Sequence, residues 1–164
     1  LIDGPYVLAV PRGTEIAGGF DGLAHLSFLR RDPDQVMGRQ IERYITATGL
    51  RLPHRFEMDS NQSITALVAG GGSWTITTPL SLLRAGRFAA DIDAHPLPGP
   101  PMSRRIVLYA TGDWTGPIPA RIADRARELI EEHFAAPGRQ KMPWLHDSFR
   151  PFPPHAAAQP EIGL

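Results

Sequence analysis

The chain has 164 residues, 42% of them hydrophobic, with 17 Lys and Arg balanced by 17 Asp and Glu and with no cysteine. This length allows one domain or two small lobes, and the zero net charge excludes a surface that binds nucleic acid or anionic lipid by charge alone. The lack of cysteine excludes disulfides and thiolate metal ligands, and no apolar run approaches the roughly 18 to 20 residues of a membrane span.

Two strands and a helix are predicted in the first part of the chain. Apolar runs over 6–10 and 26–29 are typical of buried strands. Asp32 and Gln35 have the spacing of a capping box, with a proline between them at the first helical position. Apolar residues then recur at helical spacing, so a helix is predicted over about 34–48.

The same pattern repeats twice further along. A strand over 55–58 is followed by a second capping box, Asp59–Gln62, and by a helix that ends at the glycines 70–72. A third strand over 74–77 leads into a short helix over 78–86. This alternation predicts an α/β fold with a parallel-dominated sheet, helices on both faces and ligand sites at the carboxyl ends of the strands.

The sequence divides into three regions. Residues 4–97 form one lobe with strand and helix alternation, which ends in a proline-rich connection over 95–101. Residues 98–136 hold one strand and one helix, predicted over about 118–135, which are too few elements for a complete second lobe. That helix has an apolar face without a partner, so we expect loose packing or association there. Residues 137–164 are rich in proline and are predicted to form a poorly ordered tail.

A search for catalytic and metal-binding motifs finds none. Gly70–Thr75 has threonine where nucleophile-elbow and dinucleotide-binding motifs both need glycine. His146–Ser148 contains the residue types of a catalytic triad, but adjacent residues cannot converge on one reacting atom. The six histidines lack metal-ligand spacing. The sequence therefore predicts no catalytic residue, no metal site and no cofactor.

Polar groups that suit an anion gather at one predicted edge of the sheet. Helices that start near 34–37 and 60–62 direct unpaired N–H groups and positive dipole ends toward this edge. Arg31 ends one strand there, and Thr77 and Thr78 end the next. The alternative is that these residues cap their own helices or lie in solvent, without any ligand.

Three segments follow one another in an order that points to a known family. Gly4–Pro11 contains a predicted strand, and Ala66–Gly72 is an alanine- and valine-rich helix end before a glycine turn and a strand that closes near Pro79. His95–Leu97 follows them. In this order, over about residues 4–135, the chain resembles the effector-binding domain of LysR-type transcriptional regulators. In that family, Gly4–Pro11 would be the strand that crosses between lobes, and His95–Leu97 would precede the return crossing.

The resemblance implies a type II periplasmic-binding-protein-like fold, with an effector held between two α/β lobes. It implies that residues 4–97 are a complete lobe two and that residues 98–136 are the returning strand and helix of lobe one. This C-terminal fragment then lacks the first half of lobe one, the linker helix and the helix-turn-helix. The effector-binding residues implied by the resemblance are Arg31, Gln35, Val36, Met37, Ser60, Asn61, Thr77 and Thr78. Arg30 should matter less than Arg31, because adjacent strand residues point to opposite faces.

The resemblance also implies partners and a cellular role. The effector is expected to be a small organic anion, a carboxylate. DNA is bound only through the missing N-terminal domain, and the intact bacterial regulator is cytoplasmic and forms a homodimer or homotetramer, without a membrane. The helix with Ile41, Tyr44 and Ile45 is the candidate interface, and Tyr44 is its strongest member, whereas both isoleucines suit the sheet equally well.

Two alternatives to a regulator stay open at this point. One is a solute-binding protein of the same architecture that serves a transporter. The other is an enzyme on a related two-lobe fold, which would need a nucleophile or an acid/base pair that the sequence does not offer.

Overall fold

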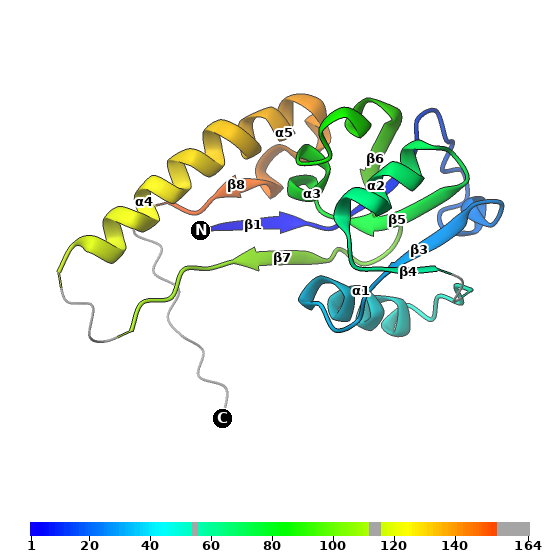
Figure 1. The fold of residues 1–164 in the computed structure, drawn as a ribbon, viewed down its shortest axis with the longest axis horizontal. Helices are drawn as coiled ribbons and strands as arrows, with labels where there is room; N and C mark the ends of the chain where they lie inside the picture. The colour runs from blue at the N-terminus through cyan, green and yellow to red at the C-terminus, as the bar shows by residue number, and fades with distance from the viewer. Residues whose placement is uncertain (54–55, 112–115, 154–164) are drawn as a thin grey trace. The chain divides into compact units, whose positions relative to one another are not determined.

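The structure, a computed structural model, describes residues 1–53, 56–111 and 116–153 (Figure 1). The chain divides into two compact units. The large unit is Pro5–Ser103, and the small unit combines Leu1–Gly4 with the chain from Arg104 onward. The sequence placed this boundary at residue 97, near the start of the proline-rich stretch.

The large unit is built on one five-stranded sheet with the order β4-β3-β5-β2-β6. Its strands are β2 (Val7–Pro11), β3 (Ser27–Arg31), β4 (Phe56–Met58), β5 (Ser73–Thr77) and β6 (Ile92–Pro96). β3 is parallel to β4 and to β5, whereas β2 is antiparallel to β5 and to β6. The α/β class is confirmed, but the sheet is mixed and not parallel-dominated.

β6 lies in a stretch that the sequence assigned to a connection. His95 pairs with Leu8 and Pro96 with Val7, so two residues of the expected connection belong to the sheet. Pro96 is tolerated because β6 is an edge strand, where a proline removes no hydrogen bond that a further strand would need.

The three helices of the large unit are α1 (Val36–Ala47), α2 (Asn61–Ala69) and α3 (Pro79–Leu83). Neither predicted capping box forms. Asp32 Oδ1 instead accepts a hydrogen bond from the Asp34 N–H at 2.8 Å, and the N-cap of α1 is Gln35. The N-cap of α2 is Ser60, whose hydroxyl accepts from the Ser63 N–H. The N-cap of α1 therefore lies three residues after Asp32, and the N-cap of α2 lies one residue after Asp59.

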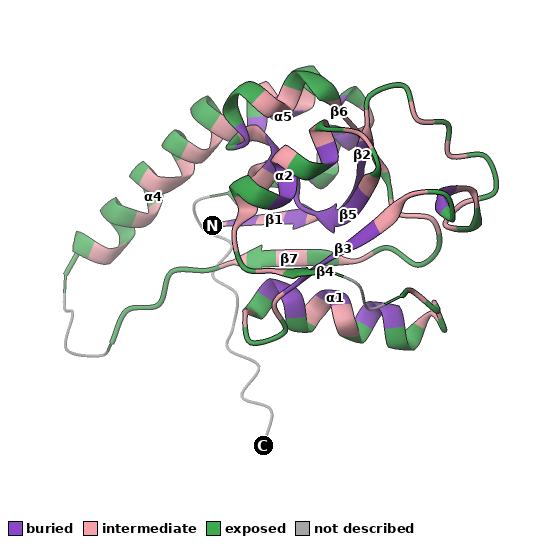
Figure 2. Cartoon of the chain, turned by 45° about the vertical axis from the view of Figure 1, so that its right-hand side comes forward, coloured by how far each residue is buried: buried purple, intermediate pink, exposed green. Residues whose placement is uncertain are grey.

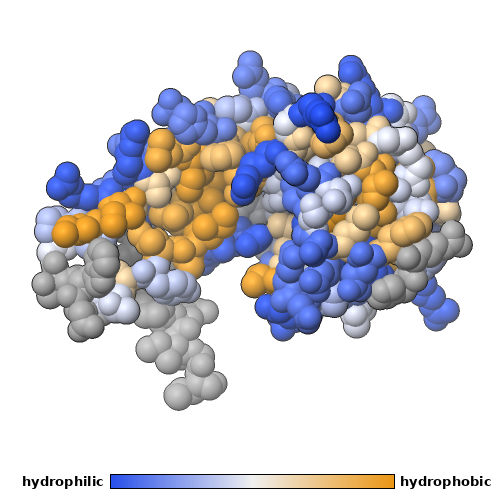
Figure 3. Space-filling model, in the orientation of Figure 1, coloured by the Kyte–Doolittle hydropathy of each residue, from blue (hydrophilic) through white to orange (hydrophobic). Residues whose placement is uncertain are grey.

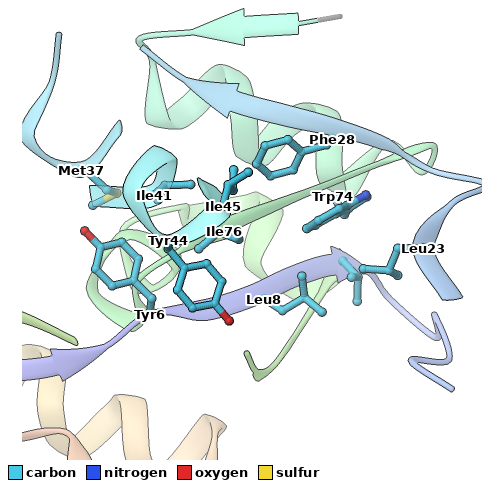
Figure 4. Close-up of a cluster of buried hydrophobic side chains, with 11 residues drawn as sticks. Tyr6, Leu8, Leu23, Phe28, Met37, Ile41, Tyr44, Ile45, Trp74 and Ile76 are labelled. Carbon is cyan, nitrogen blue, oxygen red and sulfur yellow. The ribbon is translucent and has the colours of Figure 1, made fainter. Parts of the chain in front are cut away.

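The helices cover both faces of the sheet, as expected (Figure 1). On one face, α1 packs its apolar side against β2, β3 and β5 in the main core cluster (Figure 4). On the other face, Leu29 packs with Ile64 and Val68 of α2. Phe28 and Leu29, adjacent in β3, belong to different clusters, which is the alternation expected of a strand covered on both sides.

Tyr44 lies inside this core, so its proposed role as an interface residue is wrong. The residue is 7% exposed, and its side chain packs in the main core cluster (Figure 4). Its hydroxyl donates a hydrogen bond to the Pro98 carbonyl at 3.0 Å. Helical spacing showed an apolar face but not its width, and Tyr44 falls within the part that the sheet covers.

Tyr44 predicts a loss of stability at alkaline pH. Burial raises the pKa of the Tyr44 phenol above its ordinary value. The unfolded chain then loses this proton at lower pH than the folded chain, so the stabilisation is complete below about pH 10 and is lost as the pH rises further. Tyr44→Phe should cost about 1 kcal/mol at neutral pH through the lost hydrogen bond. Its unfolding free energy should also decline less steeply than wild type above about pH 10.

Urea titrations from neutral to alkaline pH measure this effect. Tyr109→Phe is the matched control, because Tyr109 is 86% exposed, and it should retain the alkaline slope of the wild type. Equal alkaline slopes for wild type and Tyr44→Phe would contradict the prediction.

The small unit has its own three-stranded sheet with the order β7-β1-β8. The strands are β1 (Ile2–Pro5), β7 (Ser103–Ile106) and β8 (Arg150–Pro151). Its helical part runs through α4 (Ile118–Ile130), a π-helical turn (Glu131–Ala135), α5 (Ala136–Lys141) and a 3₁₀ segment (Pro143–Ser148).

The predicted disordered tail is wrong over residues 137–153. α5, the 3₁₀ segment and β8 all lie there, and Leu145 and Phe149 are 1% and 3% exposed. The prolines mislead because one follows the π-helical turn, where the regular hydrogen-bond pattern is already interrupted, and another opens the 3₁₀ segment, where a missing N–H costs little. The rest of the expected tail, 154–164, lies outside the described residues.

The apolar side of α4 is uncovered, as the sequence predicted. None of its residues is buried, and Ile118 and Ile122 are 53% and 46% exposed (Figure 2). Hydrophobic side chains form a continuous surface over this helix (Figure 3). In the described residues, no helix has the length and apolar character that a bilayer crossing requires.

Candidate functional site

Three neighbouring strands of the large unit end at the same edge of its sheet. β3 ends at Arg31, β4 at Met58 and β5 at Thr77, and both strand pairs are parallel. A helix begins within a few residues of each strand end, because the chain must turn back to continue the parallel sheet. Side chains from these strand ends and helix starts therefore meet at one edge, as the sequence predicted.

Arg31 is at the centre of this edge. Its side chain is buried, and the residue is 5% exposed. Its Nη2 donates to Asn61 Oδ1 at 2.5 Å and to Thr77 Oγ1 at 3.3 Å. One guanidinium therefore joins the end of β3, the start of α2 and the end of β5. The alternative of a solvated Arg31 is wrong.

Arg30 points to the opposite face of β3, as strand alternation requires. It forms an ion pair with Glu42 of α1, and its Nη2 donates to the Leu52 carbonyl at 3.1 Å. Its guanidinium also lies over the Phe28 ring, 5.6 Å from the ring centroid. Arg30 therefore fastens α1 and the segment after it to the sheet, away from the strand ends.

Two amide side chains connect the helix starts at the same edge. Gln35, the N-cap of α1, donates through Nε2 to the Asp59 carbonyl at 3.2 Å. Asn61 donates through Nδ2 to the Ser81 carbonyl of α3 at 3.1 Å. The start of α1 is thereby connected to the segment before α2, and the start of α2 to α3.

The remaining candidates have mainly local contacts. Ser60 and Thr78 use their hydroxyls to cap α2 and α3, which agrees with the capping alternative for Thr78. Val36 is 53% exposed in the first turn of α1 and is available to an apolar part of a ligand. Met37 is 9% exposed and packs in the core cluster instead.

The electrostatics of the edge combine one buried positive charge with exposed negative ones. Arg31 and the starts of α1 and α2 supply positive potential. Asp34 and Asp59 are exposed and Asp32 is half-buried beside them. A ligand with one negative charge at the helix starts is therefore better matched than one with several negative charges.

The edge is suited to binding. Its polar groups are a guanidinium, amides, hydroxyls and backbone N–H groups, which can hold an oxyanion but include no paired nucleophile and base. Within the described ranges 1–53, 56–111 and 116–153, no group of three or more His, Asp or Glu side chains could hold a metal ion.

Sequence reasoning missed two partners of the candidate residues. The Ser81 carbonyl accepts a hydrogen bond from the Asn61 amide, and the Ser81 N–H donates one to the Thr78 hydroxyl. The Asp59 carbonyl accepts a hydrogen bond from the Gln35 amide. The Thr78-Pro79-Leu80-Ser81 stretch carried a signal for Ser81, since a hydroxyl N-cap bonds the N–H three residues later. No sequence signal exists for the Asp59 carbonyl, because any residue has one.

The position of α1 depends on Gly38. A methyl group there would lie 2.0 Å from the Asp32 carbonyl oxygen and 3.0 Å from that of Arg31. Both are backbone atoms that cannot move without shifting the end of β3. Gly38→Ala should therefore lower the free energy of unfolding by about 3 kcal/mol through overpacking, as measured by denaturant titration.

Gly70→Ala is the matched control for Gly38→Ala. Gly70 is the C-cap of α2 with a φ of −71°, and an added methyl group would come no closer than 3.4 Å to the Ala66 carbonyl oxygen. Its effect should stay within about 0.5 kcal/mol. Equal losses in both variants would show that α1 does not approach β3 as closely as described.

The chain matches a family model and several solved structures. The model described as LysR substrate binding domain matches residues 1–132. The effector binding domain of QuiR in complex with shikimate is 12% identical, with a TM-score of 0.52 over 82% of this chain and 65% of that chain.

Two further solved structures cover less of the chain. The CcmR regulatory domain from Synechocystis PCC6803 in complex with 2-PG is 18% identical, with a TM-score of 0.48 over 57% of this chain and 46% of that chain. A probable transcriptional regulator, PA0477 from Pseudomonas aeruginosa, is 21% identical, with a TM-score of 0.46 over 60% of this chain and 35% of that chain.

The chain thus spans 35 to 65% of the length of these solved chains. A comparison with curated proteins gives no match.

Proposed function

The chain belongs to the LysR substrate binding domain family, and from that premise we propose that it senses a small organic anion, a carboxylate, on behalf of a DNA-binding transcriptional regulator. Domains of this family are the effector-binding part of LysR-type regulators and have a type II periplasmic-binding-protein-like fold. The mixed sheet of the large unit, with helices on both faces, agrees with that fold. The family match favours a regulator over a transporter's solute-binding protein or an enzyme.

One observation carries the anion proposal: Arg31 is buried at the edge where α1 and α2 begin. A buried guanidinium keeps its positive charge and interacts strongly with a charge nearby, since little water screens it. Each helix N-terminus adds up to about 1 kcal/mol for an anion, and a hydrogen bond to a charged group adds about 1.5 to 3 kcal/mol. These contributions favour a carboxylate over an uncharged molecule of the same shape.

The contacts of Arg31 assign it mainly a positioning role. Because its Nη2 holds Asn61 and Thr77, it fixes the amide and hydroxyl that face the ligand. Gln35 and Ser60 would offer the backbone N–H groups of the helix starts, with Thr78 beside them. Val36 would contact the apolar part of the effector. Met37, within the core, would support α1 rather than touch the ligand.

The proposal extends to the intact regulator. It would bind DNA through a separate domain, form a homodimer or homotetramer, and work in the cytoplasm without catalysing a reaction. This chain has no excess of basic residues with which to bind DNA by itself. Gel-shift assays should therefore detect sequence-specific binding by the intact protein and none by this chain.

Calorimetry on the complete regulatory domain tests the effector class. A panel of small monocarboxylates would be titrated together with the amide of each, which has the same shape but no charge. At least one carboxylate should bind at least about tenfold more tightly than its amide. A panel in which amides or cations bind as well as the carboxylates would overturn the proposal.

A further inference from the structure

A cavity of about 530 Å³ lies in the large unit at the end of the sheet opposite the effector site. It includes Ser27, the first residue of β3, whereas the effector site contains Arg31, the last. Gly49, just beyond α1, also lines it, whereas α1 begins at the effector site. The cavity is therefore a separate feature, and the proposed effector does not account for it.

The two walls of the cavity are held in place by hydrogen bonds. On one side, the loop over 20–26 is closed by the Leu23 N–H to Phe20 and the Leu26 N–H to Leu23. On the other side, the Leu50 N–H donates to Ile45 of α1, and Arg30 holds the Leu52 carbonyl. The cavity is therefore formed before any ligand arrives, which limits the ordering cost of binding.

Aromatic rings and leucines form one part of the cavity wall, beside polar groups of Asp21, His25, Ser27 and Arg51. Trp74 and Phe28 lie with their ring centroids 4.6 Å apart, and Phe20 lies 5.7 Å from Trp74. Figure 4 shows Trp74 at the margin of the core beside Phe28, with its indole nitrogen turned away from Ile45. Phe20, Leu26, Leu50 and Leu52, which also line the cavity, are only partly buried and pack against this core.

The charges at the cavity mouth cancel. Asp21 and Arg51 are its two charged lining residues, both are exposed, and they carry opposite signs. The carboxyl end of α1 adds negative potential near Gly49. A carboxylate therefore gains nothing at this position, whereas a planar uncharged molecule would cover the leucines and the exposed side of Phe20.

We propose that this cavity is a second ligand site, specific for a small, uncharged, planar aromatic molecule. The occupant lies against Phe20, Leu26, Leu50 and Leu52, between the two hydrogen-bonded walls. Trp74 is 2% exposed and lies beside Phe20, so its indole N–H reports on the occupant from behind this wall. The site differs from the effector site in ligand class, because a carboxylate is preferred at one end of the sheet and an uncharged ring at the other. The two sites can therefore be tested independently on the same chain.

Indole is the probe, and the signal of the Trp74 indole N–H in ¹⁵N-labelled full-length chain is the readout. The signal is assigned by its loss in Trp74→Phe. It should shift saturably with a dissociation constant of about 0.1 to 1 mM. Indole-3-acetate, which adds a carboxylate, should bind at least about tenfold more weakly.

Ala24→Phe places an aromatic ring in the cavity without removing a core residue, because Ala24 lines the cavity and is exposed. It should weaken indole binding at least about tenfold, whereas Ala47→Phe, on an exposed position of α1, should not. Nuclear Overhauser contacts between indole and the methyl groups of Leu50 and Leu52 should appear in the wild type.

Three results would each overturn the proposal. They are an unsaturated Trp74 shift up to the solubility limit of indole, equal or tighter binding of indole-3-acetate, and absence of the leucine contacts. Unchanged affinity in a folded Ala24→Phe chain would do the same.

Discussion

Replacing Arg31 with alanine should weaken carboxylate binding by at least about tenfold. The variant loses the positive charge at the strand edge and also releases Asn61 and Thr77, which Arg31 holds by hydrogen bonds. Arg31→Lys should recover only part of the affinity, because a lysine keeps the charge but is more strongly hydrated and does not place a donor where Nη2 holds Asn61 and Thr77. Calorimetry on the complete regulatory domain, with the best carboxylate of the panel, measures the change.

Arg30→Met is the matched control for Arg31→Ala. Arg30 is adjacent in sequence and 8% exposed, but it binds Glu42 and the Leu52 carbonyl on the other face of β3. Its replacement should lower the free energy of unfolding by about 2 kcal/mol and leave the carboxylate affinity within about twofold. If Arg31→Ala bound normally while Arg30→Met did not, the assignment of these side chains to the two faces would be wrong.

Phe149→Ala should destabilise the small unit by about 3 to 5 kcal/mol, the usual cost of removing a buried aromatic ring. Phe149 is 3% exposed, and its ring lies close to Gly4 of β1. Its carbonyl also accepts a hydrogen bond from Arg139 at 2.9 Å. The ring therefore connects the segment after α5 to the sheet of the small unit.

A chain that ends at Ala136 should lose more stability in the small unit than the Phe149→Ala variant does. It lacks Met142 and Leu145, both buried, and also β8, which pairs Arg150 with Asp3. Hydrogen exchange at the amides of β1 measures the effect, and both changes should increase exchange there. Ile118→Ala is the control, since that side chain is 53% exposed, and it should change stability by less than about 1 kcal/mol. Full protection of β1 in the shortened chain would show that the segment is dispensable.

The sequence by itself determined the elements whose signals are local. Apolar periodicity predicted α1 and α2, and short apolar runs predicted β2, β3 and β5, within a few residues. These signals are readable because helix and strand geometry repeat every few residues along the chain. The opposite directions of Arg30 and Arg31 follow from the same alternation, and so does the meeting of strand ends at one edge.

Only the tertiary structure decided which strands pair and in which direction. β6 pairs with β2 across about 85 residues of sequence, and β8 pairs with β1 across nearly the whole described chain. Such partners leave no periodic trace in either segment. A proline-rich stretch therefore looks disordered until a distant strand supplies its hydrogen bonds and a distant core covers Leu145 and Phe149.

The same distinction holds within the candidate site. The residue types at the strand ends could be read from the sequence, but the burial of Arg31 and the inward direction of Met37 could not. Burial depends on which surfaces meet in space, and a helical pattern specifies a face without specifying its partner. The contact of Arg31 with Asn61 and Thr77 arises only when the chain brings together residues 30 and 46 positions apart.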